Sequence, residues 1–263
     1  MSYYPILKAP GVQGWTTLCN FAPNNWETTR CPAQLINVTW PSTDGWMTKN
    51  LGVLAPNAMR TVTSNEVADV VPAEAVALLS LTISAPPSQS ETLPKLDTLR
   101  TMVPAWRATL GLSSAVAQVS YQGEIDPFPP QGTLLTFGPF MQFGASIENF
   151  LILFNIEGSP KRRQSEVEVY NADGMTLMGK FEVRNNAANV IPLDGLGFGI
   201  GDLPAFICRG LTGIPLYFSR TTDGAHMSLE HTHPPGSLVV HGRRWEAQKM
   251  LKNVWFKKVA SCR

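Results

Sequence analysis

Alternation of apolar and polar residues is the clearest pattern along the chain, and it predicts β-strands. The best example runs from Glu166 to Tyr170 and resumes from Lys180 to Arg184, after the turn residues 171–174. Asp173-Gly174 favours a hairpin turn because both residue types tolerate positive φ. We expect one face of this hairpin to bury Val167, Val169, Phe181 and Val183, and the other to expose Glu166, Glu168, Lys180 and Glu182.

Other strands are indicated by short, largely apolar runs, which are typical of strands buried on both faces. These runs are residues 35–38, 78–83, 150–156 and 214–218. With 21 glycines and 21 prolines, turns are frequent. We therefore expect a mainly β fold of two tandem antiparallel β-sandwich halves, jelly-roll or immunoglobulin-like, with short linker helices and a C-terminal helix. The expected boundaries are 1–86 for the first half, 87–112 for a linker with short helices, 113–240 for the second half and 241–263 for a basic C-terminal helix and tail.

Two segments favour helix. Residues 86–92 are rich in proline and serine, as is typical of a linker. The following residues 93–110 have apolar positions at helical spacing. Near the C-terminus, Ala247, Met250, Leu251 and Val254 recur at i, i+3, i+4 and i+7. That spacing predicts one apolar stripe on a helix.

An internal duplication is suggested by two constant offsets. Gly14 and Gly132 differ by 118 positions, as do residues 35–38 and 153–156. The pairs Asp44-Gly45 and Asp173-Gly174, and then Asn57-Ala58 and Asn186-Ala187, differ by 129. An insertion within residues 159–169 would reconcile the two offsets, and chance similarity is the alternative.

Charge is sparse and unevenly placed. Charged residues make up 16% of the chain and the net charge is +1, whereas soluble domains carry about 25%. Nucleic acid is therefore not an expected partner. Residues 241–263 alone carry seven basic residues and one acidic residue, a net charge of +6. This segment is expected to contact a neighbouring subunit, an acidic polymer or nucleic acid, or else to form a solvated helix face. Weakly charged surface also favours a homo-oligomer.

Targeting signals and membrane spans are not predicted. The N-terminal residues lack a basic segment followed by an apolar one, and no apolar run is long enough to cross a bilayer. The default localisation is therefore cytoplasmic. The four cysteines show no CxxC spacing, so we expect reduced thiols, and a disulfide between Cys19 and Cys31 is left open.

All four histidines lie within residues 226–241 and form the one chemical constellation of the sequence. His231 and His233 would share one face of a strand, and His241 would return beside them after the Pro-Pro-Gly turn. Three imidazoles with an open position suit a single Zn²⁺ or Fe²⁺. Glu230 is the candidate catalytic base, but it needs a bulge to reach the same face. One alternative is that these histidines form hydrogen bonds that fix a loop, and another is that they act as a pH switch near neutrality.

The His-Thr-His strand followed by a proline-glycine turn resembles the metal-binding strands of the cupin family over this short segment. The glutamate that cupins place a few residues later is absent, because residues 234–237 read Pro-Pro-Gly-Ser. The order of the two cupin motifs is not reproduced either. No cupin residue or activity is therefore carried over.

A cluster of tryptophans is the remaining candidate site. Trp15, Trp26, Trp40 and Trp46 lie within 32 residues. Their rings would stack on a glycan or form a protein interface, or else fill the core. The glycine-rich residues 195–201 match no phosphate-binding fingerprint and are expected to form a flexible loop.

Three functions therefore stay open. The favoured one is a non-catalytic β-sandwich binding or assembly protein, a subunit of a homo-oligomer or larger particle. The second is a metal-dependent, cupin-like enzyme that uses His231, His233 and His241. The third is a glycan-binding module. The expected cofactor is none or one divalent metal ion.

Overall fold

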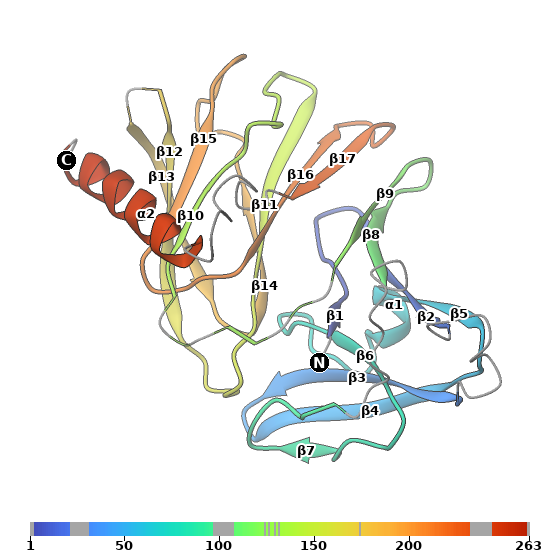
Figure 1. Ribbon diagram of the computed structural model, residues 1–263. Coiled ribbons are helices and arrows are strands. Elements are labelled where there is room, and N and C mark those ends of the chain that lie inside the picture. The colour runs from blue at the N-terminus through green and yellow to red at the C-terminus, as the bar shows by residue number, and fades with distance from the viewer. Residues whose placement is uncertain are drawn as a thin grey trace.

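The computed structural model describes residues 3–21, 32–96, 108–123, 125, 127–128, 130, 132–173, 175–231 and 244–261. In these residues, antiparallel strands form four sheets that pack in pairs as two β-sandwiches, one from each half of the chain (Figure 1). The mainly β fold with two sandwich halves is therefore confirmed.

The N-terminal sandwich packs a five-stranded sheet on a four-stranded sheet. Ile36 and Val38 of β3 share one apolar core with Leu18 of β2 and Val62 of β5. In sheet order, the five strands are β1 (Tyr4–Pro5), β6 (Leu78–Thr82), β3 (Gln34–Ser42), β4 (Gly45–Leu54) and β7 (Gln89–Ser90). The other sheet contains β5 (Ala58–Thr63), β2 (Gln13–Asn20), β8 (Thr109–Ser113) and β9 (Gln118–Gln122).

The C-terminal sandwich packs two four-stranded sheets. Val167 of β12 and Phe206 of β15 share a core with Leu151 and Leu153 of β11. One sheet contains, in order, β10 (Leu134–Phe137), β15 (Pro204–Cys208), β12 (Gln164–Asn171) and β13 (Thr176–Arg184). The other contains β14 (Ala187–Pro192), β11 (Ile147–Asn155), β16 (Ile214–Thr221) and β17 (Met227–His231).

The strand order is the same in the two sandwiches. If the strands β1 to β6, β8 and β9 are renamed β10 to β17 in that order, the strand order of the N-terminal sheets becomes that of the C-terminal sheets. Among the described residues, β7 is the one strand without a counterpart. The registers agree as well. Val38 of β3 pairs with Leu79 of β6, and Val167 of β12 pairs with Cys208 of β15. Both members of the second pair lie 129 positions after their counterparts.

This correspondence follows only one of the two offsets seen in the sequence. The offset of 129 relates β5 to β14 exactly, residue for residue, and puts Asp44 and Asp173 in equivalent hairpins. The offset of 118 is wrong, because residues 35–38 lie in β3 whereas residues 153–155 lie in β11, the counterpart of β2. Shared apolar composition produced that match.

The boundary expected at residue 113 is also placed differently. β8 pairs with β2, and β9 pairs with β8, so both strands complete the N-terminal sandwich. β7 pairs with β4 in the same half. The linker helices were expected over residues 93–110. Residues 97–107 lie outside the described part, and Thr109–Ser113 is a strand.

An apolar core joins the two sandwiches. Phe150, Ile152 and Phe154 of β11 point away from the C-terminal sandwich interior and pack in one cluster with Leu110 of β8 and Trp46 of β4. The indole N–H of Trp46 also donates to the Gly158 carbonyl oxygen at 3.0 Å. β11 is thus buried on both faces, which explains its continuous apolar sequence.

The predicted hairpin forms as β12 and β13, with Val167, Val169 and Val183 buried. Glu168, expected in water, is 5% exposed. Its carboxylate accepts hydrogen bonds from the Tyr170 hydroxyl at 2.9 Å and from Arg209 at 2.6 Å. The reason is that a helix covers this face of the sheet, which a strand pattern alone does not reveal.

That helix is α2 (Arg244–Ser261), the expected C-terminal helix. It lies along the outer face of the β10–β15–β12–β13 sheet (Figure 1). Trp255, Phe256 and Val259 make the contact. The predicted stripe is wrong, because Met250 is 65% and Val254 is 62% exposed. Within the described residues, no helix is long and apolar enough to cross a membrane.

Candidate binding pockets

Each sandwich has a pocket at the same end. The C-terminal pocket lies among the β10–β11 loop, the β14–β15 loop and the β16–β17 turn, and has a volume of about 480 Å³. The N-terminal pocket lies between the β1–β2 loop and the β5–β6 connection, and has a volume of about 290 Å³. β1–β2 corresponds to β10–β11 and β5–β6 to β14–β15, so equivalent connections form both pockets.

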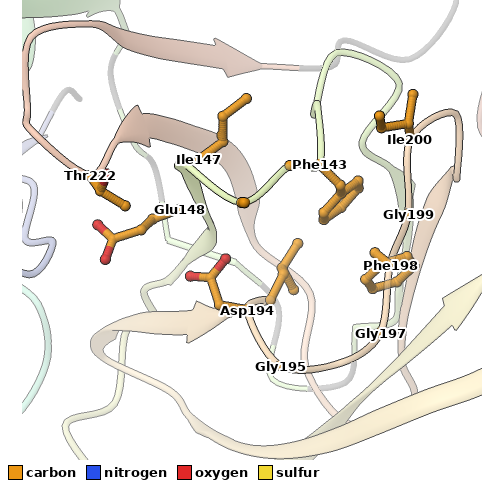
Figure 2. Close-up of a pocket in the computed structure, with 13 residues that line it drawn as sticks. Phe143, Ile147, Glu148, Asp194, Gly195, Gly197, Phe198, Gly199, Ile200 and Thr222 are labelled. Atoms are coloured by element: carbon orange, nitrogen blue, oxygen red, sulfur yellow. The ribbon is translucent and has the colours of Figure 1, made fainter.

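The C-terminal pocket has an acidic wall and an aromatic wall. Figure 2 shows the carboxylates of Glu148 and Asp194 near one another on one side, and the rings of Phe143 and Phe198 on the other. The two rings stack on each other with centroids 4.8 Å apart. A pocket of this kind can hold a ligand that has both a polar or cationic group and an apolar body.

The acidic wall is only partly neutralised. Arg220 donates from Nε to a Glu148 carboxylate oxygen at 2.5 Å and from Nη1 to the Pro10 carbonyl oxygen at 2.6 Å. Its guanidinium also lies 5.9 Å from the centre of the Phe150 ring. Arg220 is thus held in place by groups from both halves. The described residues thus place one cation against two carboxylates, which gives this part of the pocket a net negative charge.

Asp194 is the carboxylate without a cationic hydrogen-bond partner among the described contacts. Its Oδ1 accepts a hydrogen bond from the Asn149 backbone N–H at 3.4 Å. Burial raises the pKa of Asp194, and the nearby Glu148 raises it further, whereas the Asn149 N–H and Arg220 oppose the shift. A cation bound beside Asp194 would relieve this unfavourable environment.

The β14–β15 loop forms the open side of the pocket. Gly195, Gly197 and Gly201 have φ of 79°, 85° and 89°, a region that favours glycine. Asp202 fixes the far end of the loop by accepting the Gly199 N–H at 2.6 Å, a bond that lowers the pKa of Asp202. Ile200, on the pocket rim, is 94% exposed.

The N-terminal pocket is built differently. Its β5–β6 connection contains α1 (Ser64–Val67), which begins where the Thr63 hydroxyl accepts a hydrogen bond from the Glu66 N–H. Among the residues that the structure describes, Lys8 is the one charged residue that lines this pocket, and apart from Ser64 the other lining residues are glycine, alanine, valine, leucine and isoleucine. The described linings of the two pockets therefore differ in charge: two carboxylates line the C-terminal pocket, whereas one ammonium group lines the N-terminal pocket.

The histidine cluster is only partly within the described structure. His231 ends β17, and its Nδ1 lies 3.1 Å from the Pro215 carbonyl oxygen. Its ring meets that of Tyr121 edge-on, with centroids 5.1 Å apart. His233 and His241 lie outside the described residues. No group of three metal-ligating side chains occurs in the part of the chain that the structure describes.

Glu230, the candidate base, is exposed on β17 and alternates with His231, as a regular strand requires. The register of β17 with β16 runs without a shift from Met227 to His231. The bulge that would turn Glu230 toward the face of His231 is therefore not present in this strand.

The three tryptophans of this cluster that the structure describes, Trp15, Trp40 and Trp46, do not form an exposed platform. Trp15 is 8% exposed and Trp46 is fully buried, so neither ring face can stack on a sugar. Trp40 is half-buried and packs against the core of the N-terminal sandwich. Trp26 lies outside the described residues. The core-filling alternative thus holds for Trp15 and Trp46.

Sequence reasoning missed most residues of both pockets. The glycine-rich residues 195–201 are the one sequence signal of the C-terminal pocket, and the sequence alone predicts only a flexible loop there. Glu148, Asp194 and Lys8 stand in no motif, and strand pairing brings their loops together. Comparison with family models, curated proteins and solved structures gives no match for this chain.

Proposed function

We propose that the protein is a non-catalytic binding protein built from two copies of one β-sandwich module, each with a ligand pocket at the same end. One observation carries this proposal: equivalent connections form a pocket in both halves. Loops at one end of a rigid sandwich are a common place for binding residues. The 129-residue correspondence supports an origin by duplication.

The ligand of the C-terminal pocket, on this proposal, is a peptide segment with a basic side chain between apolar ones. The ammonium or guanidinium binds between Glu148 and Asp194, where it offsets the net negative charge. The apolar neighbours pack on Phe143 and Phe198. A peptide also explains the exposed Ile200 on the rim, because a longer ligand covers it.

The test is a calorimetric titration with the acetylated, amidated tripeptide Leu-Lys-Leu and with the same peptide carrying norleucine for lysine. The lysine peptide should bind at least tenfold more tightly. Asp194→Asn should abolish most of that difference, since a hydrogen bond to a charged group is worth about 1.5–3 kcal/mol. Asp173→Asn, an exposed aspartate in the β12–β13 turn, is the matched control and should change nothing. Equal affinity for both peptides would refute the proposed ligand class.

Self-association is the second candidate function, with α2 of another copy as the basic segment. It is favoured by the exposed pair Met250 and Val254, which lie one helical turn apart on a helix rich in lysine. In sedimentation velocity, wild-type protein should show a concentration-dependent oligomer. Met250→Ser with Val254→Ser should shift it toward monomer. A monomer at all concentrations would leave an external peptide as the ligand.

A further inference from the structure

In the described residues, the N-terminal pocket combines apolar walls with the single cation Lys8, and this combination selects a different ligand. Its walls come from the β1–β2 loop and from α1 with the residues that follow it. Small side chains such as Ala68, Ala73 and Ala77 leave the space open. At roughly 30 Å³ per water-sized group, the volume of about 290 Å³ has room for about ten non-hydrogen atoms.

The β5–β6 connection, on the other side of the pocket, holds the side chain of Lys8 in place. Its Nζ donates to the carbonyl oxygens of Ala73 at 2.6 Å and Ala75 at 2.8 Å. An ammonium group has three N–H donors, so these bonds use two and orient the third. Burial lowers the pKa of Lys8, and Glu74 opposes that shift. A partly desolvated ammonium beside an apolar space is complementary to a carboxylate that carries an apolar tail.

We propose that the N-terminal pocket binds an aliphatic monocarboxylate of about eight carbons. The tail packs against the aliphatic wall, and the carboxylate accepts the third N–H of Lys8. Octanoate has ten non-hydrogen atoms, the number for which there is room. This inference rests on the proposed two-pocket function, but it concerns a separate site and a ligand of opposite charge.

The experiment titrates the full-length protein with octanoate, octanol and octylamine by calorimetry. Octanoate should bind at least tenfold more tightly than octanol, because only the carboxylate pairs with Lys8. Octylamine should bind more weakly still, since it places a second cation beside the first. Octanoate binding no tighter than octanol binding would overturn the inference.

Variants separate the ligand role of Lys8 from a purely structural one. Lys8→Met keeps the length and apolar stem of the side chain, and should weaken octanoate at least tenfold while leaving octanol unchanged. Lys49→Met, at an exposed lysine of β4, is the matched control and should bind octanoate as wild type does. Wild-type affinity in Lys8→Met would show that Lys8 only fastens the connection, and would overturn the proposal.

A second variant covers the case in which Lys8→Met fails to fold. Ala68→Phe changes an exposed residue at the pocket wall and should block octanoate while Lys8 stays in place. Unchanged octanoate affinity in Ala68→Phe would also count against this site. Asp194→Asn should leave octanoate binding intact, so failure of the peptide test and failure of the octanoate test are distinguishable.

Discussion

The two sandwiches differ little in their strands and strongly in the connections that close one end. Strand order and the β3–β6 register recur in β12 and β15. The β5–β6 connection contains a short helix and an aliphatic wall, whereas its counterpart is a glycine-rich loop beside two carboxylates. The buried strand residues specify the frame, and the exposed connections are free to vary and to determine what binds.

Because an apolar core joins the two sandwiches, the halves are not expected to unfold independently. Phe154 of β11 is 1% exposed in that core, together with residues of β4 and β8. Phe154→Ala should lower the free energy of unfolding by about 3–5 kcal/mol, as expected for a large core side chain. Because both halves contribute to this core, urea should unfold the chain in one transition.

Circular dichroism and tryptophan fluorescence should therefore give coincident curves in urea, for wild type and variant alike. Val116→Ala, at a residue that is 75% exposed between β8 and β9, is the control and should change stability by less than about 0.5 kcal/mol. Two separate transitions, with the variant affecting only one of them, would show that the halves are independent domains.

A pair of equivalent asparagines gives a sharper comparison. Asn57 and Asn186 have φ of 57° and 53°, and each is the last turn residue before an equivalent strand. Only Asn186 is buried, where it accepts the Glu157 N–H at 2.7 Å and donates to the Ser159 carbonyl oxygen at 2.8 Å. Asn186→Ala should cost about 2–4 kcal/mol, because the backbone penalty adds to the lost hydrogen bonds.

Asn57→Ala should cost only about 1 kcal/mol, the backbone penalty alone. Chemical denaturation of the two variants measures the difference. Asn57→Gly, which fits positive φ, should be close to neutral. Equal losses at the two positions would mean that the buried hydrogen bonds of Asn186 add nothing to the backbone penalty.

Acid should weaken peptide binding in the C-terminal pocket at a pH at which an ordinary aspartate is still ionised. Burial raises the pKa of Asp194, so the carboxylate is lost as pH falls through a value above the usual range of about 3.9. Affinity for the lysine peptide should therefore fall at least tenfold across that pH window, while the peptide stays cationic. A titration from pH 7 to pH 4 checks this. An affinity that is constant until ordinary aspartates protonate would contradict the role of Asp194.

The smallest expected effect concerns stability at the same residue. A raised folded-state pKa means that ionised Asp194 disfavours folding at neutral pH, and that this cost disappears as pH falls through the pKa. Asp194→Asn should therefore leave the melting temperature unchanged or slightly higher at pH 7. A clear loss of stability would show that Asp194 has a structural role instead of a binding role.

The sequence pattern predicted the strands and turns that interactions between residues near in sequence determine. The β12–β13 hairpin followed from alternation and an Asp-Gly turn, and the buried strand β11 followed from its continuous apolar run. Glu168 was expected in water because alternation reports the strand and not what covers it. The apolar stripe of α2 was misplaced for the same reason: Trp255 and Phe256 face the sheet, while Val254 is exposed.

The pockets lay beyond prediction because their residues are separated in sequence and brought together by sheet pairing. Glu148 and Asp194 are 46 positions apart, and they meet because β11 pairs with β14. Lys8 reaches Ala73 across 65 positions. The 129-residue offset is the one sequence signal that relates the two pockets. It places Asp194 and Asn65 in equivalent connections, at the end of each sandwich where the pocket lies.

The central claim is that equivalent ends of two related sandwiches bind ligands of opposite charge. Backbone amide NMR of the full-length, isotope-labelled chain tests it directly, with octanoate and the lysine peptide titrated separately. We predict that the lysine peptide shifts amide signals of residues 143–148 and 193–200, and that octanoate shifts those of residues 6–14 and 64–77. Shifts from both ligands in one set of residues, or in neither set, would contradict the account.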